Sequence, residues 1–521
     1  MKDISKMTLE EKIGQMLGFA FGGQTYSKEL KTIIEKIKVG LVIYFKDNIK
    51  SPEQVFELNK KIYEKAEIPP FIALDQEGGM VARVTEGITQ SPGAMAIGAT
   101  GKPEYAYRMA QAMGKELRAL GFNFNFAPVG DVNNNPKNPV INVRSYSENP
   151  KIVAEYMMEA VKGYTDAGLM TSIKHFPGHG DTAVDSHVGL PVVDYDEERL
   201  MNVELVPFIE AVNQNAPGFM ASHVLFTHYD DKLPTSISEK IMTGLLREKL
   251  GYDGLVVTDS LTMAAIFKNF SLEEIVVNGF NSGTDILLLC GARDTKLYED
   301  FFRIAVEMAK KGVIKQERID AAVGRIMRYK EQFSVGNMAE RYENIASQLC
   351  VPESINLSNK ISEESITIIK NERNLLPLKP NEKVLVVFPK IKVVTLVEND
   401  QGELYNLSDS LKEYLMVDTH FMSLDPSKNE QDDLLEKALH YDKIIYCSYN
   451  ASFNPNQALL INSLDPSKLI VIALRTPYDL LVLPKVEVYL TSYEATPLAF
   501  ASLAKVLMGE IEATGKLPVT L

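Results

Sequence analysis

Residues 15–290 alternate between short apolar segments and longer segments of helical periodicity, and this alternation constrains the fold more than any other feature of the chain. Helical patterns such as 103–120, 150–167, 197–212 and 238–250 are long enough to be crossovers between parallel strands. The alternation therefore predicts a parallel sheet covered by helices. The apolar segments are 15–21, 39–45, 71–75, 122–128, 170–175, 218–223, 254–259 and 285–289.

Eight strand-helix units in about 330 residues is the number found in a (β/α)8 barrel of the TIM type. An open doubly wound sheet is the alternative, but the chain lacks the Gly-x-Gly-x-x-Gly turn that would support it after the first strand. The 521 residues are also too many for one hydrophobic core. We therefore assign residues 1–335 to a barrel domain, which we expect to be catalytic.

The pattern changes after residue 335. Residues 336–360 are polar and predict a partly helical linker, whereas residues 361–521 contain new apolar segments that alternate with helical ones. This alternation favours a second, smaller domain, a three-layer α/β sandwich. Because it has no comparable cluster of reactive side chains, we expect it to shield or complete the site of the barrel.

Composition restricts the partners. The net charge is −14 without a compensating basic tract, which argues against nucleic acid and anionic membrane surfaces. No apolar segment is long enough to span a membrane, and Thr8 and Glu11 have capping-box spacing where a signal peptide would be apolar. Three scattered cysteines form neither a disulfide framework nor a metal knuckle. We expect a cytoplasmic protein that acts on a small molecule; the sequence indicates no oligomeric state.

Ionisable side chains end several of the predicted strands. Asp75 ends the third, Lys174 and His175 end the fifth, and Asp259 ends the seventh. Buried apolar strands that finish in ionisable groups are unfavourable for packing alone. Since sites in (β/α)8 barrels gather at the C-terminal ends of the strands, we expect the active site there.

Three other polar residues near strand ends have less distinct roles. Asp131 follows the fourth strand, and we expect it to hold the loop that presents Arg144. His223 ends the sixth strand, and a structural role and a substrate contact remain equally open for it. Asp285 begins its strand, on the face opposite the site, and we assign it no part in function.

A segment rich in histidine, 174–187, contains His175, His179 and His187. The intervening Phe176-Pro177-Gly178 cannot continue a helix that would place His175 and His179 on one face, and the glutamate expected beside the first histidine is absent. We therefore expect no metal ion and no cofactor. A nucleophilic serine is disfavoured too, because no Gly-x-Ser-x-Gly turn occurs.

Carboxylate and imidazole chemistry remain. Asp185 and His187 are two residues apart, so the carboxylate can fix the imidazole tautomer and raise its basicity, forming an acid/base pair. With a carboxylate at a strand end, this pair supplies the nucleophile and proton donor that retaining glycoside hydrolysis requires. For Asp259, the sequence alone leaves a second interpretation equally open, a cap of the following helix.

Several motifs together resemble those of glycoside hydrolase family 3, and more narrowly those of its β-N-acetylglucosaminidase branch. The resemblance extends over nearly the whole chain, because Ile366-Thr367-Ile368-Ile369-Lys370-Asn371 is similar to the entry into that family's second domain. The motifs are Asp75-Gln76-Glu77-Gly78-Gly79 with Arg83, Arg144-Ser145, Lys174-His175-Phe176-Pro177-Gly178-His179-Gly180-Asp181, Asp185-Ser186-His187 and Val257-Thr258-Asp259-Ser260.

The resemblance implies a role for each matching residue. Asp259 would be the nucleophile that forms a covalent glycosyl-enzyme. His187 would be the general acid that later deprotonates water, and Asp185 would orient it. Residues that would bind the sugar in the −1 subsite are Asp75, Arg83, Arg144, Lys174 and His175. Arg83 and Lys174 could also form ion pairs with Asp75 and Asp259, which is compatible with sugar binding.

The resulting hypothesis is a retaining exo-β-N-acetylglucosaminidase, a β-N-acetylhexosaminidase that releases terminal N-acetylglucosamine from cell-wall or muropeptide fragments during peptidoglycan recycling. The chain has no tryptophan, so an aromatic platform for the sugar must be Tyr or Phe. A long polysaccharide cleft is therefore disfavoured, and we expect a pocket for one terminal sugar.

Three alternatives remain. A β-glucosidase or β-xylosidase of the same family is disfavoured, because a resemblance to those enzymes would not imply an acid/base in the Asp185-Ser186-His187 loop. An N-acetylglucosaminide phosphorylase stays open, because a neutral imidazole repels phosphate less than a carboxylate would. A non-catalytic sugar-binding protein would be expected to lose Asp259 or His187, and both are present.

Overall fold

The structure is a computed structural model that describes residues 2–182, 185–186, 188–291, 293–391 and 405–521. Its larger part is a parallel sheet in the order β7-β6-β3-β2-β1-β13-β12-β10-β8. Each predicted apolar segment of residues 15–290 overlaps at least one of these strands. They are β1 (Leu17–Ala20), β2 (Leu41–Tyr44), β3 (Phe71–Leu74), β6 (Phe124–Asn125), β7 (Met170–Thr171), β8 (Ile173–Phe176), β10 (Gly218–Ala221), β12 (Leu255–Ser260) and β13 (Ile286–Leu289).

The sheet curls into a barrel through its fifth predicted strand. That strand is interrupted at Ser172, and its two halves, β7 and β8, are the two ends of the sheet. The first half pairs with β6 and the second with β10, while an isolated parallel bridge joins Val129 to Lys174. One continuous stretch of chain thus contacts both neighbours, and the predicted (β/α)8 barrel is confirmed.

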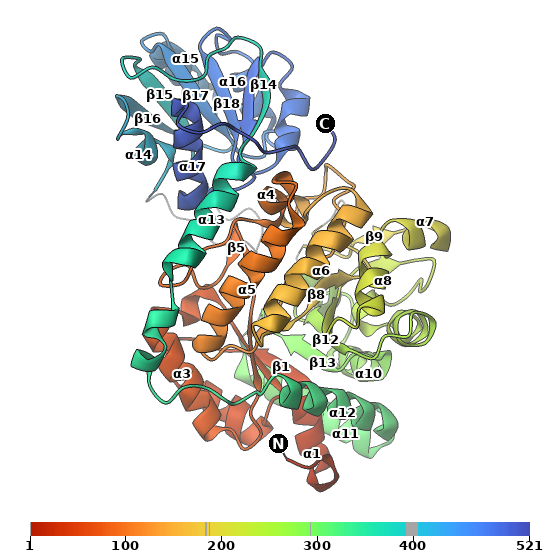
Figure 1. Cartoon of the computed structure of the whole chain (residues 1–521). Helices are drawn as coiled ribbons and strands as arrows, with labels where there is room; N and C mark the ends of the chain where they lie inside the picture. Colours follow the sequence, from red (N-terminus) through yellow and green to blue (C-terminus); the bar gives the residue numbers. More distant parts are fainter. Residues whose placement is uncertain (1, 183–184, 187, 292, 392–404) are drawn as a thin grey trace.

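Helices surround the barrel (Figure 1). The capping box predicted at Thr8 and Glu11 begins the first of them. One prediction was wrong: residues 197–212 form two helices, because Val203 has a non-helical backbone and Pro207 has no N–H to continue the hydrogen-bond ladder. The helices are α1 (Leu9–Gln15), α2 (Lys28–Lys31), the π-helix η2 (Thr32–Ile37), α3 (Pro52–Lys65), α4 (Ala94–Ala99), α5 (Pro103–Ala119), α6 (Pro150–Asp166), α7 (Glu197–Asn202), α8 (Val206–Asn213), the π-helix η6 (Lys240–Lys249), α9 (Ala264–Phe267), α10 (Leu272–Ser282), α11 (Thr295–Lys310) and α12 (Gln316–Gln332), besides short 3-10 turns.

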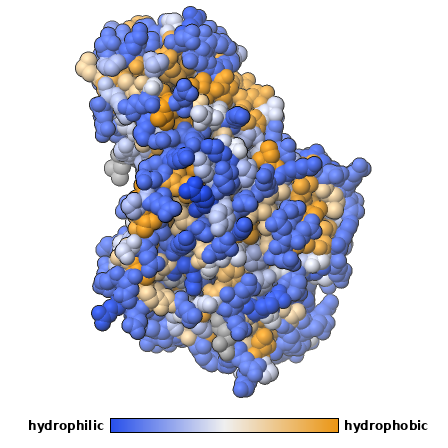
Figure 2. All heavy atoms as spheres, viewed as in Figure 1, coloured by the Kyte–Doolittle hydropathy of each residue, from blue (hydrophilic) through white to orange (hydrophobic). Residues whose placement is uncertain are grey.

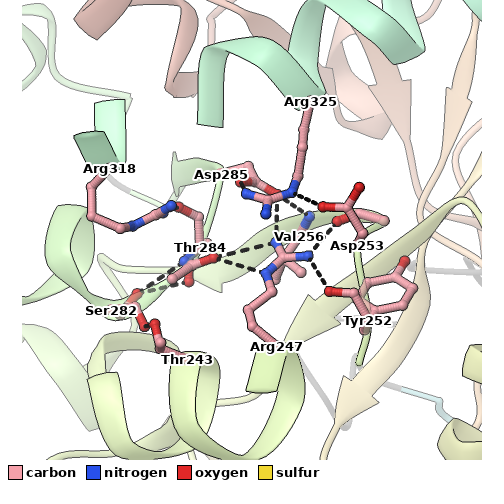
Figure 3. Close-up of polar contacts among 12 residues, drawn as sticks. Thr243, Arg247, Tyr252, Asp253, Val256, Ser282, Thr284, Asp285, Arg318 and Arg325 are labelled. Carbon is pink, nitrogen blue, oxygen red and sulfur yellow. Dashed lines mark hydrogen bonds and ion pairs between the residues drawn. The ribbon is translucent and has the colours of Figure 1, made fainter. Parts of the chain in front are cut away.

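A largely buried polar network lies at the N-terminal ends of β12 and β13, and Figure 3 shows its contacts. The carboxylate of Asp285, just before β13, accepts hydrogen bonds from Arg247 (2.7 Å), Arg325 (3.3 Å) and the backbone N–H of Val256 (2.8 Å). These contacts join η6, α12 and β12. Asp285 therefore has a structural role at this end, away from the strand ends where the site was expected.

The second part of the chain is built on a six-stranded sheet in the order β14-β19-β18-β17-β15-β16, in which only β14 runs antiparallel to its neighbour. Helix α13 (Pro352–Ser365) leads into it and crosses the domain boundary proposed at residue 360. The strands are β14 (Thr367–Asn371), β15 (Val384–Pro389), β16 (Val417–Met422), β17 (Lys443–Ser448), β18 (Leu469–Ala473) and β19 (Val488–Thr491).

Helices cover both faces of this second sheet. Alternate residues of β15 face opposite sides: Val384 and Val386 belong to one apolar core, and Leu385 and Val387 to another. Helices α14 (Leu407–Leu411) and α17 (Pro497–Met508) contribute to the first core, whereas α15 (Lys428–Ala438) and α16 (Pro455–Ile461) contribute to the second. The predicted three-layer sandwich is confirmed.

The surface is largely hydrophilic (Figure 2), as expected for a chain in which 24% of the residues are charged. Figure 2 shows a face that is largely hydrophilic, with hydrophobic residues in scattered groups. Over the described ranges, no helix combines the length and apolar character needed to cross a membrane.

Candidate active site

A cavity of about 820 Å³ opens at the C-terminal ends of the barrel strands. It is lined by six of the eight predicted site residues: Asp75, Arg83, Arg144, Lys174, His175 and Asp259. Asp185 is described but is not part of this lining, although its neighbour Ser186 is. His187 lies outside the described residues. The cavity therefore lies where the sequence predicted the active site, at the C-terminal ends of the strands.

A short hairpin supplies one wall of the cavity. Asp75 follows β3 directly, and β4 (Gln76–Gly78) and β5 (Val81–Ala82) then form an antiparallel pair that leads to Arg83. The buried Gln76 holds this hairpin together, because its side-chain oxygen accepts hydrogen bonds from the backbone N–H groups of Arg83 (2.8 Å) and Val84 (3.1 Å). Asn125 bonds to both backbone groups of Gln76 at 2.9 Å. The hairpin is therefore fixed to the barrel at its base.

Five charged side chains form a nearly buried cluster around this hairpin. The ammonium of Lys174 lies 2.8 Å from Asp75 Oδ1 and 2.6 Å from Glu77 Oε1. Asp75 also contacts Arg83 at 3.2 Å. The guanidinium of Arg144 donates two hydrogen bonds, of 2.8 and 2.9 Å, to the carboxylate of Glu77. Two carboxylates thus share three cations.

Both carboxylates of the cluster are ionised at neutral pH. Burial by itself raises the pKa of Asp75, but the charges of Lys174 and Arg83 outweigh it, so the pKa lies below its ordinary value. Burial likewise raises the pKa of Glu77, and the opposing charges of Arg144 and Lys174 bring it down to about 2. Because Glu77 holds both Arg144 and Lys174, it positions two of the predicted sugar-binding residues.

Asp131 orients His175. Its fully buried carboxylate contacts Nδ1 of the His175 ring at 2.6 Å and accepts backbone hydrogen bonds from His175 (3.1 Å) and His179 (2.7 Å). The expected role, holding the loop that presents Arg144, belongs instead to its carbonyl oxygen, which accepts a 2.6 Å hydrogen bond from Ser145. A carboxylate on Nδ1 fixes the ring orientation and tautomer.

Asp259 lies in β12 and lines the cavity together with Ser260. Its Oδ1 accepts a 2.7 Å hydrogen bond from the backbone N–H of Ser260. The next helix, α9, has Met263 at its N-cap, so the interpretation of Asp259 as a helix cap is wrong. The carboxylate is therefore a lining group of the cavity.

His179 ties together the loop that carries Asp185. Its ring lies 2.7 Å from Thr182 Oγ1 through Nδ1 and 3.2 Å from Ser186 Oγ through Nε2. Burial, with a smaller effect of the nearby His175, lowers the pKa of His179 to about 4, so the ring is neutral at physiological pH. Asp185 accepts backbone hydrogen bonds from Val188 (2.9 Å) and Gly189 (3.0 Å) through its carbonyl oxygen.

His223 is structural. Its fully buried ring contacts Ser236 Oγ at 2.7 Å and the carbonyl oxygen of Ser260 at 2.8 Å. The second contact holds the residue that follows Asp259. Across the described part of the chain, no group of three or more His, Cys, Asp or Glu side chains is arranged to hold a metal ion.

Sequence reasoning missed several lining residues. Two guanidinium groups lie over the ring of Phe45, those of Arg83 and Arg293, at 5.6 and 5.1 Å from the ring centroid. Phe45 ends the second predicted apolar segment, so the strand-end rule could have identified it. Glu77 belongs to the Asp75-Gln76-Glu77-Gly78-Gly79 motif, but the motif did not predict a role for it. Other lining residues that were missed are Phe126, Val140, Met220, Met263, Phe267, Lys268 and Arg293.

Comparisons with known proteins agree with this geometry. The family model described as "Glycosyl hydrolase family 3 N terminal domain" matches residues 8–329. Beta-hexosaminidase A of Pseudoalteromonas piscicida is 33% identical over 95% of this chain and 92% of its own length. A protein of Cellulomonas fimi named beta-N-acetylglucosaminidase/beta-glucosidase is 27% identical over 87% of this chain and 84% of its own.

A solved structure is similar over the full length. The glycoside hydrolase family 3 beta-N-acetylglucosaminidase from Paenibacillus sp. str. FPU-7 superposes with a TM-score of 0.94 at 39% identity, covering 99% of both chains. The family match covers more than half of the chain, and the similarity extends across both domains. The chain therefore belongs to glycosyl hydrolase family 3 and is a glycoside hydrolase.

Proposed function

We propose that this enzyme is a retaining exo-β-N-acetylglucosaminidase. The observation that carries the proposal is the buried cluster of Asp75, Glu77, Arg83, Arg144 and Lys174, all of which except Glu77 line the cavity that Asp259 also lines. An ionised carboxylate accepts hydrogen bonds from two sugar hydroxyls, and the cations donate to hydroxyl and acetamido oxygens. The names of the similar proteins, which include hexosaminidases and N-acetylglucosaminidases, support this choice of sugar.

The proposed reaction has two displacements. The Asp259 carboxylate attacks the anomeric carbon, the bond to the aglycone oxygen breaks, and protonated His187 gives its proton to that oxygen. Water then attacks the anomeric carbon of the glycosyl-enzyme while neutral His187 takes a proton from it, which restores the Asp259 carboxylate. Asp185 orients the imidazole and stabilises its charged form.

The remaining predicted residues form the proposed −1 subsite. Asp75 would accept from sugar hydroxyls, with Lys174 and Arg83 as fixed donors on either side. His175, held by Asp131, would present its other ring nitrogen to the sugar. Since these contacts are made before the sugar arrives, binding requires little reorganisation.

The cavity can hold one terminal sugar together with part of its aglycone, and the aromatic side chains Phe45, Phe126 and Phe267 take the place of tryptophan as apolar surfaces. We further propose muropeptide fragments as natural substrates, in peptidoglycan recycling in the cytoplasm. Lys268, which lines the cavity, supplies a positive charge suited to an acidic aglycone. Cleavage of N-acetylglucosaminyl-N-acetylmuramic acid no faster than chitobiose would count against this choice of aglycone.

Hydrolysis of an aryl β-N-acetylglucosaminide by the wild type and by Asp259→Asn tests the proposal. The substitution keeps the side-chain shape and removes the nucleophile, so activity should fall at least about 1,000-fold. Asp253→Asn is the matched control, because Asp253 is an exposed residue paired with Arg325 and Arg328 at the other end of β12. Activity of Asp259→Asn equal to that of the control would overturn the assignment.

The alternatives are tested with the same protein. The Cellulomonas fimi relative carries both glycosidase names, so an aryl β-glucoside and a β-xyloside should be assayed in parallel. We expect the N-acetylglucosaminide to have the highest kcat/KM. Formation of N-acetylglucosamine 1-phosphate in phosphate buffer would show phosphorolysis, and sugar binding without any turnover would show a non-catalytic protein.

A further inference from the structure

The β4–β5 hairpin of the barrel inserts its tip into the second domain. Met80, at the turn between Glu77 and Arg83, is only 4% exposed and belongs to the apolar core formed by the second sheet and α17. Its sulfur lies 3.4 Å from the backbone N–H of Ala495, on the segment after β19. A side chain that lies between two sugar-site residues in sequence is thus buried in the other domain.

Glu494 holds the same hairpin from the second domain. Its side chain is 1% exposed, and Oε2 accepts a 2.6 Å hydrogen bond from the backbone N–H of Gly93, while Oε1 accepts a 2.9 Å hydrogen bond from Thr496. Oε2 also packs against Gly79, where a Cβ would lie only 2.6 Å away. The carboxylate therefore lies directly against the turn of the hairpin and against the loop beside it.

The loop that carries Arg144 is held by the second domain as well. Arg475, fully buried, donates a 3.2 Å hydrogen bond to the carbonyl oxygen of Pro139. The next carbonyl, that of Val140, accepts from Arg144 at 3.3 Å. On the other side of the loop, Val143 packs in an apolar cluster with Tyr478, Tyr493 and Val519 of the second domain.

The β4–β5 hairpin depends on the second domain for its shape. The strands of the hairpin have three and two residues, and so short a ribbon does not hold its shape without support. The hairpin positions Asp75, Glu77 and Arg83. Glu77 in turn forms ion pairs with Arg144 and Lys174. Without the second domain, the base of the hairpin would remain fixed by Gln76, but its turn would lose its packing.

We propose that the second domain is part of the substrate-binding apparatus, with Met80 and Glu494 as positioning residues that hold the sugar-binding cluster in place. This inference rests on the proposed function, because it takes the cluster to be the −1 subsite. Displacement of a binding group by about 1 Å can reduce activity about 100-fold, so small movements of the hairpin suffice. The effect should be on binding, since Asp259 lies on the barrel strand β12 and not on the hairpin.

The test compares Met80→Ala and Glu494→Ala with a matched control in the full-length enzyme. Met422→Ala removes another buried methionine of the second domain, 1% exposed but in the core on the opposite face of the sheet. For each variant, the measurements are KM and kcat for an aryl β-N-acetylglucosaminide, the inhibition constant of free N-acetylglucosamine, and the Tm. Kinetics are recorded well below the lowest Tm of the set.

We expect Met80→Ala and Glu494→Ala to raise KM and the inhibition constant about tenfold or more, with a smaller change in kcat. Glu494→Gln should recover most of the binding, because its amide oxygen can still accept from Gly93 and Thr496 can turn its hydroxyl to accept from the amide. Met422→Ala should lower the Tm while KM and the inhibition constant stay within about twofold of the wild type.

Unchanged KM and inhibition constants in Met80→Ala and Glu494→Ala would overturn the inference, and so would an equal rise in Met422→Ala. The proposed function fails in a different way, since a wild type that does not turn over the N-acetylglucosaminide refutes it before any variant is compared.

Discussion

Lys330 offers a quantitative test of the barrel core. It lies on α12 with its side chain fully buried, and its ammonium contacts the neutral Gln15 Oε1 at 2.5 Å and faces the ring of Phe71 at 5.5 Å. Among the described residues it forms no ion pair. Burial therefore lowers the pKa of Lys330 from 10.5 to about 7.

Burying the charged amine lowers the free energy of unfolding. The difference between the ordinary pKa of 10.5 and the pKa of about 7 in the folded protein corresponds to about 5 kcal/mol. Between about pH 7 and pH 10.5 the unfolded chain binds more protons at this lysine than the folded chain does, so the free energy of unfolding rises with pH. Below pH 7 the full cost is present. Lys330→Met removes it but leaves Gln15 without its donor, which costs about 1–3 kcal/mol.

We therefore expect Lys330→Met to raise the free energy of unfolding by about 2–4 kcal/mol at pH 6 and to lose this advantage at pH 10. Denaturant unfolding at pH 6, 8 and 10 measures it. Lys115→Met, the same substitution on the exposed side of α5, is the control and should change stability by less than about 0.5 kcal/mol at each pH. The reasoning is refuted if Lys330→Met is less stable than the wild type at pH 6, or if its gain is independent of pH.

Three further substitutions test the site and the barrel. Lys174→Met should raise KM for an aryl β-N-acetylglucosaminide at least about tenfold in steady-state kinetics while the protein stays folded, because Asp75 keeps its contact with Arg83. Asp285→Ala should lower the free energy of unfolding by about 3–5 kcal/mol in denaturant titrations, because it leaves the largely buried Arg247 without its carboxylate. Phe45→Ala should raise KM about three- to tenfold by removing an aromatic wall of the cavity.

A different result would contradict each of these three predictions. A Lys174→Met enzyme with wild-type KM would show that the ammonium does not contact substrate, and loss of its folded signal would show that the cluster is required for folding. An Asp285→Ala protein as stable as the wild type would refute the structural role of the network in Figure 3. For Phe45→Ala, a fall in kcat without a change in KM would contradict the assignment to substrate binding.

The barrel and the position of its cavity could be predicted because both depend on local patterns. Apolar strands buried on both faces are short continuous runs, and ionisable residues such as Asp75 and Asp259 at their ends stand out against that background. The same rule applies to Phe45, which was missed only because an aromatic residue at a strand end is not unusual. The split of helix 197–212 was not foreseen, although Pro207 marks where the second helix begins.

The parts that escaped prediction depend on contacts between distant segments. The β4–β5 hairpin is too short for a periodic pattern, and its shape comes from Gln76 and Asn125 on different strands. Gly93 and Glu494 are 401 positions apart, so nothing local indicates that one accepts a hydrogen bond from the other. The ion pairs of Glu77 likewise arise only when the barrel closes.

The central claim is that Asp259 becomes covalently bound to the sugar. The enzyme should be treated with a 5-fluoro-N-acetylglucosaminyl fluoride, which forms the glycosyl-enzyme faster than water removes it, and then digested for mass spectrometry. The account predicts one added fluoro-N-acetylglucosaminyl group on the peptide that contains Asp259, and none in Asp259→Asn. An adduct on another residue, or full turnover of the aryl substrate by Asp259→Asn, would contradict it.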